Sequence, residues 1–135
     1  MRQRPSHPSD SQSIVKLAAA AALDRKAEDL SVYDVDALSG YADYFLLASG
    51  RSTRQTIAIA ERVQRVLKKA GIKPLGVDGL KDGRWALLDF GDVVVHVFHS
   101  PVREFYDLDS LWADAPKLEL ETEMLAGLIP QEAGQ

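Results

Sequence analysis

Apolar and polar positions alternate most regularly in two neighbouring runs, Trp85–Phe90 and Val93–His99. A Gly-Asp pair separates them, and such a pair between two alternating runs predicts a β-hairpin with a two-residue turn. Closure at that pair fixes the register of the hairpin. The opposed pairs would be Trp85 and Phe98, Leu87 and His96, Asp89 and Val94, and Phe90 and Val93.

The two faces of this hairpin differ in character, because side chains alternate across a strand. One face is wholly apolar and carries Ala86, Leu88, Phe90, Val93, Val95 and Val97. The other face carries Trp85, Leu87, Asp89, Val94, His96 and Phe98. The first predicts a core surface that helices cover. The second sets an acid and an imidazole into an apolar surface, which is typical of protein recognition, although burial under the C-terminal helix is the alternative.

The remaining periodicities predict helices and strands on either side of the hairpin. The expected elements are an alanine-rich helix over Ile14–Leu30 with Ser13 as N-cap, strands over Leu30–Val35 and Tyr44–Ala48, a helix from a Ser52/Gln55 capping box to Ala70, a strand over Ile72–Val77, and a last helix that Pro101 opens. That last helix would carry one apolar stripe: Val102, Phe105, Leu108, Leu111 and Trp112. The order α-β-β-α-β-β-β-α predicts a single α/β domain with a mixed five-stranded sheet flanked by helices.

Both ends of the chain differ in composition from the segment between them. Residues 1–12 are polar, with two prolines and three serines, and are expected to be a disordered tail. Residues 117–135 form an acidic tail with some helical periodicity but no evident partner. The folded domain is therefore expected to span residues 13–116.

Charge and composition narrow the class of partner. The net charge is −4 and the pI about 5.3, which argues against broad electrostatic binding to nucleic acid and leaves room only for a local basic patch. The absence of cysteine excludes disulfides and thiolate metal sites. No apolar run reaches the ~18 residues of a membrane span, and the first residues lack a secretory pattern, so a cytoplasmic protein is expected.

Two pairs of residues are compatible with an enzyme. Asp34 and Asp36 would lie on the same side of a strand end and could hold Mg²⁺, although such pairs are common at strand ends. Arg51 and Arg54 flank a predicted helix N-terminus that could hold a phosphate, although the capping box explains that sequence and a P-loop lysine is missing. A metal-dependent nucleotidyltransferase or nucleotide-binding protein that uses these four residues remains the alternative function.

Other chemistry finds no support in the residues. His96 and His99 are three positions apart on a strand and point to opposite faces, so they cannot chelate one ion. No Ser/His/Asp or Cys/His arrangement is apparent, and no metal or cofactor is expected. Trp85 begins a strand beside charged residues, which favours exposure and a role as an interface hot spot.

Three stretches carry a resemblance, in the order ADYFLLASGRSTRQ (Ala42–Gln55), GVDGLKDGRWALLDFGDVVVHVF (Gly76–Phe98) and VREFYDLDSLWADA (Val102–Ala115). Together they resemble the ribosomal silencing factor family, also called Iojap-like, over roughly Ile14 to Ala115. The resemblance implies a protein that binds the large ribosomal subunit through its ribosomal protein fourteen, blocks joining of the small subunit and represses translation. It also implies a nucleotidyltransferase-like fold without a working active site, and hence no enzyme.

The resemblance assigns the partner-binding region as well. The family's Trp-initiated strand maps onto Trp85, Leu87 and Asp89, and the region is extended here to His96, Tyr106 and Trp112. An acidic chain suits a basic ribosomal protein rather than a specific nucleic-acid sequence or a membrane. An exposed sheet surface could also pair with a second copy when the chain is free. A small dimerising adaptor without ribosome contact is the third hypothesis.

Overall fold

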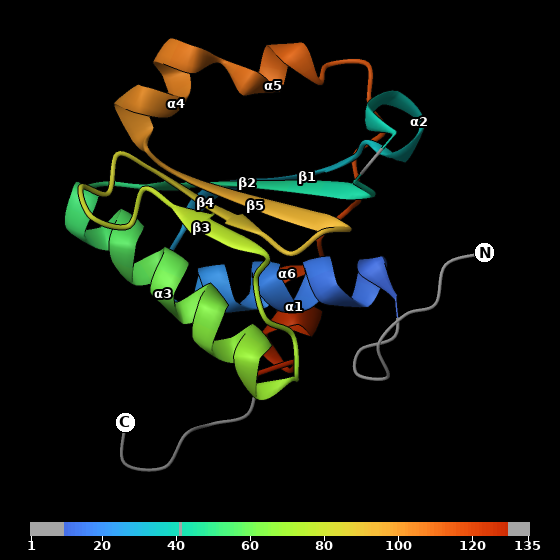
Figure 1. Cartoon of the computed structure of the whole chain (residues 1–135), viewed down its shortest axis with the longest axis horizontal. Helices are drawn as coiled ribbons and strands as arrows, with labels where there is room; N and C mark the ends of the chain where they lie inside the picture. The colour runs from blue at the N-terminus through green and yellow to red at the C-terminus, as the bar shows by residue number, and fades with distance from the viewer. Residues whose placement is uncertain (1–9, 41, 130–135) are drawn as a thin grey trace.

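The computed structural model describes residues 10–40 and 42–129 and places one mixed sheet between two layers of helices (Figure 1). The strands are β1 (Glu28–Asp34), β2 (Tyr44–Gly50), β3 (Gly76–Asp78), β4 (Trp85–Asp89) and β5 (Val93–His99). The helices are α1 (Ser11–Asp24), α2 (Asp36–Ser39), α3 (Thr53–Lys69), α4 (Ser100–Tyr106), α5 (Leu108–Leu111) and α6 (Thr122–Ala126). The predicted α/β domain with a mixed five-stranded sheet is confirmed.

The strand order β1-β2-β5-β4-β3 makes β5 the centre of the sheet. It pairs parallel with β2 and antiparallel with β4. The predicted hairpin register is confirmed, because Trp85 lies opposite Phe98 and Leu87 opposite His96. The turn closes where the Gly-Asp pair stands, with the Phe90 amide donating to the Val93 carbonyl at 2.9 Å.

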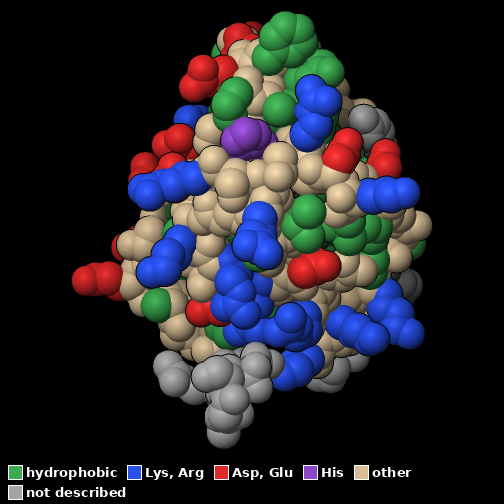
Figure 2. Space-filling view, turned by 90° about the vertical axis from the view of Figure 1, so that its left-hand side faces the viewer, with side chains coloured by type: hydrophobic (Ala, Val, Ile, Leu, Met, Phe, Trp, Pro, Cys, Tyr) green, Lys and Arg blue, Asp and Glu red, His purple; other side chains and the backbone are tan. Residues whose placement is uncertain are grey.

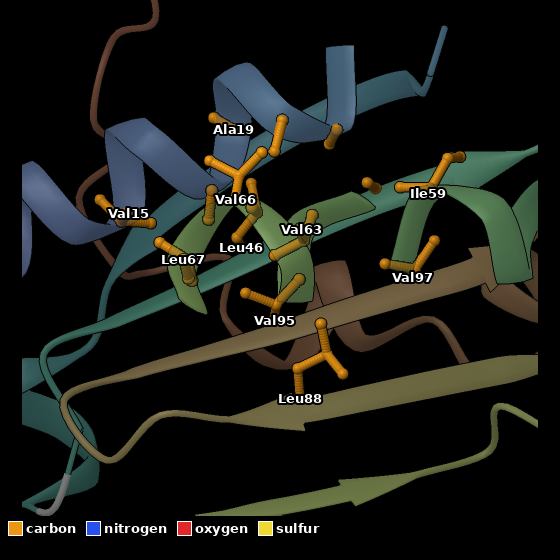
Figure 3. Close-up of a cluster of buried hydrophobic side chains, with 14 of the residues drawn as sticks. Val15, Ala19, Leu46, Ile59, Val63, Val66, Leu67, Leu88, Val95 and Val97 are labelled. Carbon is orange, nitrogen blue, oxygen red and sulfur yellow. The ribbon is translucent and has the colours of Figure 1, made fainter. Parts of the chain in front are cut away.

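The main core lies between the sheet and the helices α1 and α3 (Figure 3). The alanine run of α1, residues 18–22, is almost completely buried, and its small side chains let the helix approach the sheet and α3 closely. Figure 3 shows Val63 of α3 and Ala19 of α1 in the same cluster as Leu46 and Val95 of the sheet. This is the face of the hairpin that the sequence predicted to be core.

The first helix begins and ends earlier than its periodicity suggested. Asp10 is the N-cap, with its carboxylate accepting the Ser13 amide at 2.7 Å, so Ser13 lies inside the helix. Residues 11 and 12 are therefore helical, and most of the predicted N-terminal tail lies outside the described residues. At the other end Lys26 has a positive φ of 63°, which turns the chain into β1. Asp and Ser are equally good caps, so composition alone did not choose between them.

The capping box of α3 forms as predicted, with one difference. The Ser52 hydroxyl accepts the Gln55 amide at 3.0 Å, while the Gln55 side chain accepts the amide of Arg51 rather than that of Ser52. The same Gln55 side chain donates to the carbonyls of Arg25 and Lys26, which ties the start of α3 to the α1–β1 turn. The N-terminus of α3 is thus satisfied from within the chain.

The prediction of a single last helix is wrong, because the structure has two short helices there. Asp107 takes a left-handed conformation (φ 52°) and separates α4 from α5. The predicted apolar stripe therefore splits, because Val102, Leu108 and Trp112 pack on the sheet while Phe105 and Leu111 are 81% and 71% exposed. Aspartate tolerates this conformation better than most residues, and the Ser110 hydroxyl donates to its carboxylate at 2.7 Å.

The acidic C-terminal segment does find a partner. The Leu118 amide donates to the Val32 carbonyl, and the Asp34 amide donates to the Pro116 carbonyl, so residues 116–118 cover the β1 edge of the sheet. Helix α6 then packs against α1, with Leu125 buried in the main core. The short helix α2 was not expected, because it is too short to show a helical period, whereas α5 lies within the predicted last helix and α6 within the tail that showed some helical periodicity.

Gly79 gives a test of how tightly the β3–β4 connection packs. Its φ is +82°, and a Cβ there would overlap the carbonyl oxygen of Trp85. Gly40 also has a positive φ, but a Cβ added to it would meet no atom within 4 Å, so it is a matched control. We expect Gly79→Ala to lower the free energy of unfolding by about 3 kcal/mol or more and Gly40→Ala by only about 1–2 kcal/mol. Equal losses in urea titrations would contradict the close approach at Trp85.

Candidate functional site

The helices α4 and α5 cover only part of the sheet. They lie on the side opposite α1, α3 and α6 (Figure 1), and α4 packs against β5 and β2. On this side β4 is left partly open to solvent, with Trp85, Leu87 and Asp89 each half-buried. We call the surface formed by these three residues and by Phe105 and Tyr106 of α4 the β4 face.

Trp85 is the centre of this surface. Its ring lies 4.8 Å from the Phe98 ring on the neighbouring strand and 5.0 Å from the Tyr106 ring, measured between centroids. Its indole N–H donates to Nδ1 of His96 at 3.2 Å. Three separate elements, β4, β5 and α4, thus hold one half-exposed aromatic side chain in a fixed position.

His96 lies under the surface rather than on it. Only 5% of the residue is exposed, so it supports Trp85 and offers a partner little area of its own. Because Nδ1 accepts the indole hydrogen bond, the neutral ring carries its proton on Nε2, which has no acceptor within the described residues. Burial lowers the pKa of His96 to about 4, so the imidazole is neutral at physiological pH.

Trp112 belongs to the far side of the same aromatic cluster. Its ring packs edge-on against Phe45 at 5.0 Å, and Phe45 in turn contacts His96 at 5.2 Å. No described residue accepts a hydrogen bond from its indole N–H. Trp112 is therefore linked to Trp85 through the rings of Phe45 and His96. No ring contact among the described residues joins the two indoles directly.

The other predicted site residues differ in how far their side chains are exposed and in what they contact. Tyr106 is 54% exposed and contributes an accessible ring beside Trp85. Leu87 adds an apolar side chain to the half-open strand. Asp89 also has a structural task, because its carboxylate accepts the Gly91 amide at 2.8 Å and thereby supports the hairpin turn.

Sequence reasoning missed Phe105 as a surface residue. Its ring stands at 89° to Tyr106 with 5.1 Å between centroids, and it extends the β4 face outward. The periodicity had assigned it to a buried stripe. The ring is exposed because α4 buries Arg103, and a residue two positions further along lies on the opposite side of the helix.

A buried arginine fixes α4 and α5 over the sheet. Arg103 donates to both carboxylate oxygens of Asp109 at 2.9 and 3.0 Å, to the Ser49 hydroxyl at 2.9 Å and to the Asp29 carbonyl. The two hydrogen bonds that Asp109 accepts from Arg103 lower the pKa of its carboxyl group. The Tyr33 hydroxyl also donates to Asp109, and burial, with this hydrogen bond, raises the pKa of Tyr33 to about 12. The network was not expected from the sequence, since Asp29, Tyr33 and Ser49 are far from Arg103 and Asp109 in the chain.

Of the four residues proposed for an enzyme, Asp34 and Arg51 have side chains that the fold itself uses. The Asp34 carboxylate accepts the Asp36 amide at 3.2 Å, and Arg51 pairs with Glu28 at 2.6 Å. The start of α3 is already capped by Ser52 and Gln55. Among the described residues no three His, Cys, Asp or Glu side chains come together as a metal site.

None of the described helices combines the length and the apolar character that a membrane crossing requires.

The buried imidazole predicts a pH dependence of stability. The folded-state pKa of His96, about 4, lies below the ordinary value of about 6.5, so the unfolded chain binds more protons between these values. Stability contributed by neutral His96 is full above pH ~6.5 and is lost as the pH falls toward 4. Between pH 7.5 and 5.5 the loss should be on the order of 1 kcal/mol in urea titrations. His96→Phe should abolish this share and the control His99→Gln should keep it; an unchanged pH difference in His96→Phe would contradict the assignment.

The family model and the similar sequences point to the same protein family. The model of the family "Ribosomal silencing factor during starvation" matches residues 8–133. A ribosomal silencing factor of Bacillus subtilis is 44% identical over 110 residues, which cover 82% of this chain and 93% of that protein. The chloroplastic protein Iojap of Arabidopsis thaliana is 38% identical over 81% of this chain and 45% of its own length.

Solved structures agree with the sequence comparison. A crystal structure of a protein from Chromobacterium violaceum has a TM-score of 0.76 and 40% identity, with 82% of this chain and 92% of that chain covered. One from Bacillus halodurans has a TM-score of 0.73 and 39% identity, over 82% of this chain and all of the other. The fold, the three sequence stretches and the family match coincide, and this chain belongs to the ribosomal silencing factor family.

Proposed function

We propose that this chain binds the large ribosomal subunit through the β4 face, with ribosomal protein fourteen as the direct partner, and that it prevents the small subunit from joining. The observation that carries the proposal is the half-exposed Trp85, held by Phe98, Tyr106 and His96 on a strand whose outer side α4 and α5 leave partly open. Membership of the ribosomal silencing factor family supplies the class of partner.

The composition of the β4 face supports a protein partner. Interface centres are enriched in Trp, Tyr and Phe, and the energy of binding concentrates in a few such residues. The β4 face offers Trp85, Tyr106 and Phe105 beside Leu87, with Asp89 as its charged member. A single carboxylate beside an apolar centre favours a basic protein surface.

Steric exclusion is the mechanism that fits a domain of this size. The core of buried aliphatic side chains between the sheet, α1 and α3 makes the domain a rigid body. A rigid body seated on one subunit occupies the volume that the other subunit needs, so no chemical step is required. We propose on this basis that the chain represses translation in the cytoplasm and is not an enzyme.

We propose further that the β4 face pairs with a second copy of the chain in the absence of ribosomes. Exposed apolar rings such as Phe105 are costly to leave in water, and a self-complementary contact would cover them. Addition of large subunits should then convert dimers to subunit-bound monomers in sedimentation.

Replacement of the central indole tests the proposed site. Trp85→Ala should weaken binding to purified large subunits by about thirtyfold or more, because a central aromatic hot spot is worth about 2 kcal/mol or more. The same variant should fail to block addition of small subunits. Pelleting with large subunits and light scattering during subunit joining measure the two effects.

The control is Leu38→Ala, which removes an exposed apolar side chain (56% exposed) from α2. It should bind like the original chain. Urea titration of both variants checks the fold. A folded Trp85→Ala that binds with unchanged affinity removes the β4 face from the proposal.

The enzyme alternative has its own test. Asp34→Asn combined with Asp36→Asn should leave subunit binding and the block of joining intact, because both residues lie where β1 leads into α2 rather than on the β4 face. Loss of the block in a well-folded double variant, together with Mg²⁺-dependent nucleotide binding by the original chain, would favour the nucleotidyltransferase hypothesis.

A further inference from the structure

We propose that the exposed side of α3 binds the phosphate backbone of ribosomal RNA while the β4 face binds protein. This inference rests on the proposed function and adds a second contact to it. We call the surface formed by the exposed charged residues of the helix, Arg54, Glu61, Arg65, Lys68 and Lys69, the α3 outer face.

The charge of α3 is opposite to that of the whole chain. The helix contains five basic residues and one acid, a net charge of +4, in a chain whose net charge is −4. Solvated helix surfaces usually mix the two signs so that neighbours four residues apart attract. The α3 outer face instead concentrates one sign.

The helical period aligns these charges. Arg54, Glu61, Arg65 and Lys68 are spaced by seven, four and three residues, so they lie along one side of the helix. The opposite side buries Ile59, Val63 and Leu67 in the core. From Arg54 to Lys68 the row extends about 21 Å at 1.5 Å per residue, enough to follow several phosphates.

The basic residues of the α3 outer face differ in their ion pairing from the basic residues that stabilise the fold. Arg62, on the inner side of α3, pairs with Asp24 at 2.8 Å, and Arg103 pairs with Asp109. By contrast, Arg54, Arg65 and Lys68 make no ion pair with any described residue. Their charges are thus available to a ligand.

The β3–β4 loop continues the basic surface toward the β4 face. A Cβ at Gly83 would lie 2.5 Å from the Thr53 carbonyl, so this loop presses on the first turn of α3. It carries two exposed bases, Lys81 and Arg84, with the exposed acid Asp82 between them, and Arg84 immediately precedes Trp85. Figure 2 shows Lys and Arg gathered toward the bottom of this side of the molecule and hydrophobic side chains at its top. One large partner could therefore touch both surfaces.

The chemistry of the surface favours RNA over an acidic protein. A protein interface needs an apolar centre, and none of the large exposed hydrophobic residues of the described chain lies on α3. A phosphate backbone needs only cations, because release of its condensed counterions supplies the free energy. The absence of exposed aromatic rings on this helix also points to backbone contact without reading of bases.

Salt dependence tests the inference. The affinity for large subunits should be measured between about 50 and 200 mM KCl at fixed Mg²⁺ for the original chain and for Arg65→Ala/Lys68→Ala. The slope of log K against log salt is negative, and each lost phosphate contact should reduce its magnitude by about 0.7 to 0.9, so the double variant should reduce it by about 1.4 to 1.8. The matched control, Lys16→Ala/Lys117→Ala, removes the same charge elsewhere and should leave the slope almost unchanged. Arg65→Lys/Lys68→Arg should keep the original slope.

The outcomes separate the two proposals. Trp85→Ala should reduce affinity without changing the slope, and failure of the original chain to bind subunits would end the proposed function and this inference together. If Arg65→Ala/Lys68→Ala binds with the same salt slope as the control Lys16→Ala/Lys117→Ala, the α3 contact is overturned and the proposed function is not affected. Protein-free RNA extracted from large subunits should show the same loss with Arg65→Ala/Lys68→Ala. A loss confined to intact subunits would assign the α3 outer face to an acidic protein and overturn the RNA assignment.

Discussion

The pairing of β5 between β2 and β4 is the constraint on which the rest of the structure depends. The register of this central strand puts His96 beneath Trp85 and Phe98 beside it, and the alternate residues Val93, Val95 and Val97 into the main core. A slip of one residue would exchange the two faces and place the imidazole among the buried valines. The core and the candidate site are therefore set by the same hydrogen-bond ladder.

Two helical layers then give the faces of the sheet different tasks. The α1 and α3 side is filled by small and branched side chains and is closed, with Leu88 and Val97 completely buried. The other side is closed only where the Arg103–Asp109 pair anchors α4 and α5, and it remains open over β4. An amphipathic helix such as α3 can bury one side in this arrangement and still present Arg54 and Arg65 to a ligand.

Local signals predicted much of this arrangement. The hairpin register followed from alternation and one Gly-Asp turn, and the start of α3 followed from Ser52 and Gln55. The break at Asp107 and the Arg103–Asp109 network did not, because neither has a local sequence signature. Trp85 was expected to be exposed and lies on a half-open strand, whereas the burial of His96 among the rings of Phe45, Trp85 and Phe98 depends on packing that no strand pattern contains.

The buried position of His96 still serves the proposed function. A partner that binds a mobile indole must first immobilise it, at a cost of about 0.5–1.5 kcal/mol for an ordered side chain. Trp85 is already held by a hydrogen bond to a neutral imidazole and by rings on two sides, so most of that cost is met when the domain folds. Burial keeps the imidazole neutral and therefore able to accept this bond. In the proposed complex, buried His96 would thus hold Trp85 in place without touching the partner itself.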